Sequence, residues 1–323
     1  MFIWRDSMFR AMKYAYEISK EKSFSKAAKK LFISQPSLSI TIKKLERNLG
    51  VTLFDRSSMP IQLTEAGQVY MEMAGQIIAI QDNMESYVKD YTELKTGTLA
   101  LGAPHTFSSL FMPVFIRAFS KKYPGVKITL DEADTMTLQK KLLNNDVDIV
   151  IDTCDFDGKF FLSYPIIEER ILLMVPKDNK INNKLLKYRF SIYDLQNDYE
   201  IVKGKDPVPL SYFKEELFIM LHKGHDVHKR GMDVCAQYGF YPNVYMYLNQ
   251  LMSCYYMSNE GIGITFISDT IVKMIHVKSD NVFLYKLNNK TSQRNILMAH
   301  KKSRHMSKAA REFMRVAVNE SVL

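Results

Sequence analysis

The chain has 323 residues, of which 46% are hydrophobic and 24% are charged. This balance excludes a disordered chain, and the lack of any uncharged apolar run of about 18 residues argues against a membrane-spanning helix. The net charge is +9, and residues 1–66 carry twelve basic residues against six acidic ones. A basic N-terminal segment on a near-neutral remainder indicates a polyanionic partner, although a solvated lysine surface would give the same count.

The first ten residues and the cysteines both favour a cytoplasmic protein. The sequence MFIWRDSMFR has charges inside its apolar run, unlike the apolar core of a secretory signal peptide. Cys154, Cys235 and Cys254 are widely spaced and form no CxxC pair, so we expect a reducing compartment. No cofactor motif is present, because Gly261 and Gly263 are too few for a dinucleotide fingerprint.

Two short helices are predicted at the start of the chain. Apolar residues recur at helical spacing over residues 7–20. Ser23 is well placed to cap a second helix over residues 24–32, and the small Ala27-Ala28 pair allows another helix to approach it closely.

A third helix is predicted over residues 35–48. Ser34 is a good N-cap residue, Pro36 suits the first turn, and Gly50 ends the helix. Two helices joined by a tight turn are typical of a helix-turn-helix, whose second helix enters the major groove of DNA.

The outer face of this third helix has the chemistry of a DNA-reading surface. Glutamine offers a bidentate donor and acceptor pair to adenine, serine and threonine read either base edge, and lysine suits phosphates. We therefore predict DNA binding here, with a helical hairpin that only buries alanine and leucine as the alternative. The outer residues are Gln35, Ser37, Ser39, Ile40, Thr41, Lys43 and Lys44, of which the two lysines are the expected phosphate contacts.

Residues 51–54 and 61–63 are predicted as the two strands of a wing. The stretch from Ser23, SFSKAAKKLFISQPSLSITIKKLERNLGVTLFDR, with LTEAG at residues 63–67, resembles the N-terminal region of the LysR-type transcriptional regulators. The agreement in order and spacing covers residues 12–67.

The resemblance implies which residues meet DNA. The DNA-reading end of the recognition helix would comprise Ser34, Gln35, Pro36, Ser37 and Ser39, and Arg56 would lie by the wing, near the backbone or the minor groove. The chain departs from the family pattern at Ile40 and Thr41, where larger polar or basic residues are usual, and in a wing without basic residues. These departures point to an unusual operator.

Residues 67–97 are predicted as a long helix and a hinge. An exposed apolar stripe of this length needs a partner, and an antiparallel copy of itself is the simplest one. A helix packed on its own domain is the alternative, but the resemblance favours a homodimer that reads a two-fold-related site, and further assembly to a homotetramer. The stripe comprises Val69, Met73, Ile77, Ile80, Met84, Tyr87, Val88, Tyr91 and Leu94.

Residues 98–323 alternate strands and helices, which predicts an α/β fold with a parallel sheet. We expect two lobes, the first over residues 98–170 and 268–323 and the second over residues 171–267. Two α/β lobes joined by crossovers resemble a periplasmic binding protein, and the LysR family has such an effector-binding domain. The segment NEGIGITFIS, residues 259–268, matches the family pattern and is expected to lead back to the first lobe.

Three strand-to-helix junctions are candidates for an effector site. Ligands of such folds bind at strand carboxyl ends, where helix N-termini present free N–H groups. The hydroxyl, lysine and histidine side chains suit a small anion such as a carboxylate, although ordinary helix caps would look similar. The resemblance places the cleft between the first two junctions and the third, which gives Pro104, His105, Thr106, Phe107, Thr135, Met136, Lys223 and His225.

Other readings have weaker support. His222, His225 and His228 have a metal-like spacing, but Gly224 interrupts them and we predict no metal site. An enzyme is a third hypothesis, but the sequence shows no nucleophile paired with a base and no phosphate-binding loop. A small-molecule receptor without a DNA role is the main alternative to a regulator. A gel shift with DNA from upstream of the gene would separate the two.

Overall fold

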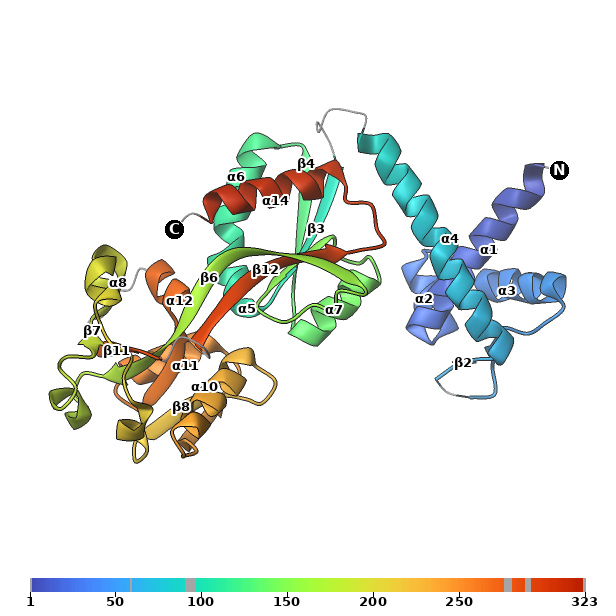
Figure 1. The fold of residues 1–323 in the computed structure, drawn as a ribbon. Coiled ribbons are helices and arrows are strands. Elements are labelled where there is room, and N and C mark those ends of the chain that lie inside the picture. The colour runs from blue at the N-terminus through green and yellow to red at the C-terminus, as the bar shows by residue number, and fades with distance from the viewer. Residues whose placement is uncertain (1, 59, 91–96, 276–280, 288–291, 322–323) are drawn as a thin grey trace. The chain divides into compact units, whose positions relative to one another are not determined.

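The computed structural model describes residues 2–58, 60–90, 97–275, 281–287 and 292–321 (Figure 1). The chain folds into two compact units, residues 1–91 and 92–323. Each unit has its own hydrophobic core. None of the described helices is long and apolar enough to cross a membrane.

Three helices form the first unit around a small core. They are α1 (Phe2–Glu21), α2 (Phe24–Lys30) and α3 (Gln35–Leu49). The side chain of Ser23 caps α2, which ends two residues earlier than predicted because Phe32 takes a left-handed φ of 55° in the turn. Ala27 and Ala28 are buried, so α1 and α3 can pack close to α2.

A two-stranded wing follows α3. Gly50 ends the helix with φ +73°, a conformation that favours glycine. The strands are β1 (Phe54–Asp55) and β2 (Gln62–Leu63), and they pair antiparallel. The wing is anchored to the next helix at Gly67, where an added Cβ would lie 2.0 Å from the carbonyl oxygen of Leu53.

The long helix α4 (Glu65–Asp90) confirms the predicted helix up to residue 90, and residues 91–96 lie outside the described part. Met71 and Ala74 are buried and attach the helix to its own unit. The predicted stripe stays exposed where it is described, with Val69, Met73, Ile77, Ile80 and Met84 all between 47% and 67% exposed.

The second unit opens with the predicted parallel βαβαβ arrangement. Its elements are β3 (Gly97–Ala103), α5 (His105–Leu110), α6 (Met112–Lys122), β4 (Val126–Glu132), α7 (Thr135–Leu143) and β5 (Ile149–Asp152). Strand β3 pairs in parallel with β4 and with β5. Because strand side chains alternate, Ile149 and Ile151 pack with α6 and Val150 packs with α7, so helices cover both faces.

The second lobe has its own sheet and core. Its elements are η1 (Lys180–Asn183), β7 (Arg189–Phe190), α8 (Ile192–Asn197), α9 (Tyr199–Lys203), η2 (Leu210–Phe213), β8 (Leu217–Leu221), α10 (Asp226–Gln237), β9 (Asn243–Leu248), α11 (Leu251–Asn259), β10 (Ile264–Ser268), α12 (Asp269–Met274) and β11 (Val282–Lys286). Strand β8 lies parallel to both β9 and β10. The fold is thus the predicted pair of α/β lobes.

Two long strands, β6 (Phe161–Pro176) and β12 (Gln293–Lys301), connect the lobes and run side by side (Figure 1). The first half of β6 pairs with β12 in the first lobe, and the second half pairs with β10 and β11 in the second lobe. The expected return to the first lobe at residue 268 is therefore wrong. Strand β12 makes that return, and it leads to α14 (Lys308–Glu320), which packs on α6.

Candidate functional site

The N-terminal end of α3 is held by its cap. The hydroxyl of Ser34 accepts a hydrogen bond from the amide of Ser37 at 3.3 Å, and Pro36 lies in the first turn. Leu38, Ile42 and Leu45 are buried, which fixes the orientation of the helix. The structure therefore uses Ser34 as a cap and turns the other side of α3 to solvent.

The exposed face of α3 contains most of the residues expected to meet DNA. Gln35, Ser37 and Ile40 are exposed, and Ile40 remains 67% accessible. Ser39 is half-buried. Thr41 is also half-buried, and its hydroxyl donates to the carbonyl oxygen of Ser37 at 2.9 Å. Thr41 thus retains acceptor capacity but its donor is engaged within the helix.

Lysines on α3 carry uncompensated positive charge. Lys43 and Lys44 are exposed, and neither forms an ion pair with any residue that the structure describes. Lys30 on α2 differs, because it pairs with Glu17 at 2.6 Å and with Glu21 at 3.0 Å. The charges at residues 43 and 44 are therefore available to phosphates.

Arg56 has internal partners that the sequence does not predict. Its guanidinium donates to Glu46 at 3.0 Å and stacks over the ring of Phe24 at 5.0 Å. Glu46 is buried on α3 and also accepts from the amides of Leu53 and Phe54. Arg56 thus fastens the wing to α3, and only about a third of its side chain is exposed.

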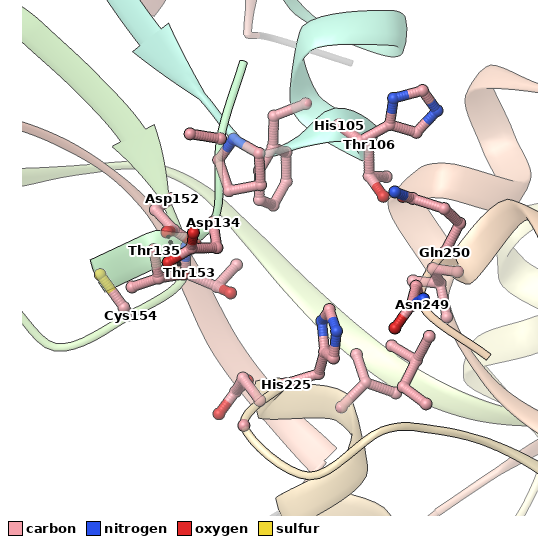
Figure 2. Close-up of a pocket in the computed structure, with 18 of the residues that line it drawn as sticks. His105, Thr106, Asp134, Thr135, Asp152, Thr153, Cys154, His225, Asn249 and Gln250 are labelled. Atoms are coloured by element: carbon pink, nitrogen blue, oxygen red, sulfur yellow. Dashed lines mark hydrogen bonds between the residues drawn. The ribbon is translucent and has the colours of Figure 1, made fainter. Parts of the chain in front are cut away.

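A cavity of about 800 Å³ lies between the two lobes of the second unit. Figure 2 shows Asp134, Thr135, Asp152, Thr153 and Cys154 on one side of this cleft and Asn249 and Gln250 on the other. The first group comes from the carboxyl ends of β4 and β5 and the start of α7. The second group lies between β9 and α11, so each lobe supplies one wall.

Six of the eight predicted effector-site residues line this cleft, namely Pro104, His105, Thr106, Phe107, Thr135 and His225. Met136 and Lys223 do not line it, and Met136 is 68% exposed. Met136 does not line the cleft because successive residues of an α-helix point in different directions, and Thr135 is the one that faces the cleft. Lys223 precedes Gly224, which has φ +103°, and the turn there leaves Lys223 outside the lining.

Sequence reasoning missed several lining residues. Asn249 and Gln250 immediately precede a helix, which is the same signal that identified the other junctions. Asp152 ends β5, so the rule that ligands bind at the carboxyl ends of strands also points to it. Arg294 could not be found in this way, because it lies in the crossing strand β12, which was not predicted.

Asp152 is buried at the back of the cleft. It is 4% exposed, and its carboxylate accepts from the hydroxyl of Thr135 at 2.7 Å and from the amide of Thr153 at 2.6 Å. Burial raises the pKa of this carboxyl above its ordinary value, although these hydrogen bonds and the charge of Arg294 act in the opposite direction.

Arg294 is the centre of a buried ion network where the lobes meet. Its guanidinium contacts Glu169 of β6 at 2.5 Å and Asp226 of α10 at 2.6 Å. Asp226 also accepts from Arg230 at 2.7 Å, and Ser268 donates to Glu169. Although burial opposes ionisation, the two arginines hold the pKa of Asp226 below its ordinary value.

The described histidines and cysteines have separate surroundings. No group of three metal-ligating side chains occurs among the described residues. His228 turns inward, where its Nδ1 lies 2.7 Å from the carbonyl oxygen of Leu221. Burial raises the pKa of the Cys154 and Cys235 thiols to about 12 and that of Cys254 to about 11, which disfavours the reactive thiolate.

Two family models match the chain and together cover most of it. The LysR substrate binding domain matches residues 92–321, and the bacterial regulatory helix-turn-helix protein, lysR family, matches residues 9–68. Among curated relatives, the uncharacterized HTH-type transcriptional regulator YcgK of Bacillus subtilis (strain 168) is 29% identical over 313 residues, which are 95% of this chain and 93% of the relative. A probable RuBisCO transcriptional regulator of Thalassiosira pseudonana is 28% identical over 262 residues, 79% of each protein.

Solved structures show the same fold. A full-length OxyR variant from Pseudomonas aeruginosa has a TM-score of 0.69 at 19% identity and covers 98% of this chain and 94% of its own. CbnR, a LysR family transcriptional regulator, has a TM-score of 0.56 at 16% identity, with 97% and 99% covered. The winged helix-turn-helix, the long helix and the two-lobed domain predicted from the sequence are thereby confirmed. The chain belongs to the LysR family of DNA-binding transcriptional regulators, in which a helix-turn-helix is joined to an effector-binding α/β domain.

Proposed function

We propose that this regulator reads its operator through the exposed face of α3. Gln35, Ser37 and Ser39 contact base edges in the major groove, and Lys43 and Lys44 bind phosphates. Support comes from the orientation of α3, whose cap and buried leucines leave these side chains outward. Ser34 and Pro36 hold the helix end, and Thr41 serves as an acceptor.

Ile40 is an apolar side chain on the DNA-reading face of α3. An exposed isoleucine has no hydrogen bond to offer, but it can pack against the C5-methyl group of thymine. Its exposure of 67% on the same face as Lys43 and Lys44 supports this role. Arg56 holds the wing in place, and a direct contact with the DNA backbone is secondary to its bond with Glu46.

The exposed stripe of α4 pairs two copies of the chain. LysR regulators bind operator DNA and small-molecule effectors and assemble as dimers or tetramers. Pairing through Val69, Met73, Ile77, Ile80 and Met84 removes an apolar surface from water and gives one α3 to each half of a two-fold-related site. The division into residues 1–66, 67–97 and 98–323 then corresponds to reading, pairing and sensing, in the cytoplasm and without enzymatic activity.

The interlobe cleft is the proposed effector site. The lobes are joined by two strands, β6 and β12. A ligand that contacts both lobes favours one angle between them and so shifts the protein toward a conformation that it already populates. The altered lobe angle changes how dimers pack, and with it the spacing of the two α3 helices and the bend in the DNA.

The single observation that carries the DNA-reading proposal is that Gln35 is exposed on the same helix as Lys43 and Lys44, which pair with no acidic residue in the described part of the chain. Gln35→Ala is therefore tested in gel shifts with DNA from upstream of its own gene and with a shuffled sequence of equal length. We expect specific binding to weaken at least about fivefold, the value of one good bidentate contact, while binding to the shuffled DNA stays unchanged. Gln237→Ala, an exposed residue of the second unit, is the matched control. Equal loss on both DNAs would show that Gln35 does not read bases.

A further inference from the structure

The lining of the cleft is predominantly acidic. Five carboxylates line it, from Glu132, Asp134, Asp152, Asp155 and Asp226, against only two permanently basic side chains, from Lys229 and Arg294. This composition reverses the charge that the sequence predicted for the site. The expected lysine, Lys223, is also absent from the lining.

One of the two basic groups is already neutralised. Arg294 is buried and bonded to Glu169 and to Asp226, so it presents no uncompensated charge to a ligand. Lys229 is exposed on α10. Glu132 is likewise bonded to His105, and Asp226 is bonded to Arg230 and Arg294. A carboxylate in the cleft would therefore meet Asp134, Asp152 and Asp155, which form no ion pair with any described residue, and one solvated ammonium group.

Two of the helix ends that favour anions already have a carboxylate of the chain. Asp134 caps α7, where its carboxylate accepts from the amide of Thr137 at 3.0 Å and from the hydroxyl of Thr137 at 2.7 Å. Asp226 is in the first turn of α10. The N-termini of α7 and α10 thus already face a carboxylate of the chain, whereas α5 and α11 begin at the cleft without a side-chain cap and without an acidic residue in the first turn.

Asp152 has the opposite property, a buried carboxylate without a cationic partner. It accepts hydrogen bonds from Thr135 and Thr153, but it forms no ion pair with any residue in the described part of the chain. Each carboxylate oxygen can accept a second hydrogen bond. A buried carboxylate normally has a partner charge, and here the open cleft is the place from which such a charge can come.

We propose that the effector carries a positively charged nitrogen, a protonated amine or a guanidinium, which binds Asp152 on the first-lobe wall of the cleft. The amides of Asn249 and Gln250 on the facing wall bind the polar remainder of the molecule. Because no three-ligand metal group occurs among the described residues, the cation is organic. This inference rests on the proposal that the cleft is the effector site.

The raised pKa of Asp152 fits this assignment. Burial disfavours the ionised carboxylate more than its hydrogen bonds and the charge of Arg294 favour it, so an incoming ammonium group adds a direct counter-charge. The ammonium group interacts with Asp152 on the first-lobe wall, whereas the amides of Asn249 and Gln250 lie on the second lobe. A ligand that bridges the two walls therefore favours a closed angle between the lobes.

The test uses the full-length protein and matched probes of opposite charge. Linear α,ω-diamines of three to six carbons, the corresponding diols and the corresponding dicarboxylates are added at equal ionic strength, and thermal unfolding is followed. We expect the diamines alone to raise the melting temperature in a dose-dependent manner. Preference for the dicarboxylates, or the same response to all three series, including no response to any, would overturn the proposal.

Asp152→Asn provides the second arm. It keeps the size of the side chain and removes its charge, so we expect diamine affinity to fall at least about thirtyfold. Asp155→Asn, an exposed lining residue, is the matched control and should change affinity far less. Undiminished diamine binding by Asp152→Asn would refute the assignment of Asp152.

Gel shifts on the same samples separate this inference from the proposed function. A protein that binds its upstream DNA specifically but prefers dicarboxylates remains a regulator with a differently charged effector. A protein without sequence-specific DNA binding contradicts the proposed function, whatever the probe preference.

Discussion

Replacing Arg294 tests the ion network at the junction of the lobes. Arg294→Met keeps an unbranched side chain of similar length but removes the charge that faces Glu169 and Asp226. Asp226 keeps Arg230 as a partner, whereas Glu169 is 0% exposed and, among the described side chains, keeps the hydroxyl of Ser268 as its hydrogen-bond donor. The variant therefore leaves one fully buried carboxylate without a counter-charge.

Breaking such a buried pair costs about 3–5 kcal/mol, because the remaining charge is desolvated and uncompensated. For a domain of this size, 1 kcal/mol corresponds to about 2–4 °C in melting temperature. We therefore expect the second unit to melt about 6–20 °C lower than in the unchanged protein. Differential scanning calorimetry of the full chain resolves this transition.

A matched substitution distinguishes the stability cost of leaving a buried charge unpaired from the cost of losing an exposed ion pair. Arg315 is 68% exposed and pairs with Glu312 at 2.5 Å, so Arg315→Met should cost no more than about 1 kcal/mol. The double variant Arg294→Met/Glu169→Gln should regain part of the loss, since it removes the orphaned charge. An Arg294→Met protein as stable as Arg315→Met would refute this reasoning.

Three further substitutions test the reading, pairing and sensing regions. Lys43→Ala should weaken binding to all DNA sequences alike and reduce the slope of log K against log salt by about 1, and an unchanged slope would rule out a phosphate contact. Ile77→Asp should shift the protein toward monomers in analytical ultracentrifugation, because a charge enters the paired stripe. Gln68→Asp, which is exposed on another side of α4, should leave the assembly intact. Asp152→Asn should raise the stability of the ligand-free protein at pH 7, since burial raises the folded-state pKa of Asp152. The free energy of unfolding of the unchanged protein should therefore fall as pH rises from about 4 toward the raised pKa of Asp152. Urea titrations at several pH values should show a smaller fall in the variant. An identical pH dependence would count against a perturbed Asp152.

The first unit was predictable because its signals are local. Ser23, Ser34 and Gly50 each specify a helix end through their own backbone or side-chain chemistry, and the structure shows all three in those roles. The function of Arg56 was not predictable from the same stretch. Its bond to Glu46 depends on how the wing folds back on α3, which no local pattern encodes.

In the second unit, the strands that connect the lobes could not be predicted from local sequence. Glu169 and Arg294 face each other near one end of the pairing between β6 and β12, so neither strand reads as a continuous apolar run. Only the fold brings the two charges together and makes them compatible with burial. The lobe boundary at residue 268 was misplaced for this reason.

Six of the eight residues predicted for the effector site line the cleft, but the excess of carboxylates in its lining was not predicted. Strand ends and helix starts are visible in sequence, which is why His105, Thr135 and His225 were found. The net charge of the lining depends on which neighbours face inward. Asp152 and Asp226 do so, whereas Lys223 does not.

The central claim is that α3 reads a specific DNA site and that the cleft controls this reading. Its most direct test is a binding titration of the full-length protein on DNA from upstream of its own gene and on a shuffled sequence, with and without the diamines. We expect preferred binding to the upstream DNA, a two-fold-related footprint, and an altered footprint on addition of diamine. Equal affinity for both DNAs, with a footprint that no ligand changes, would contradict it.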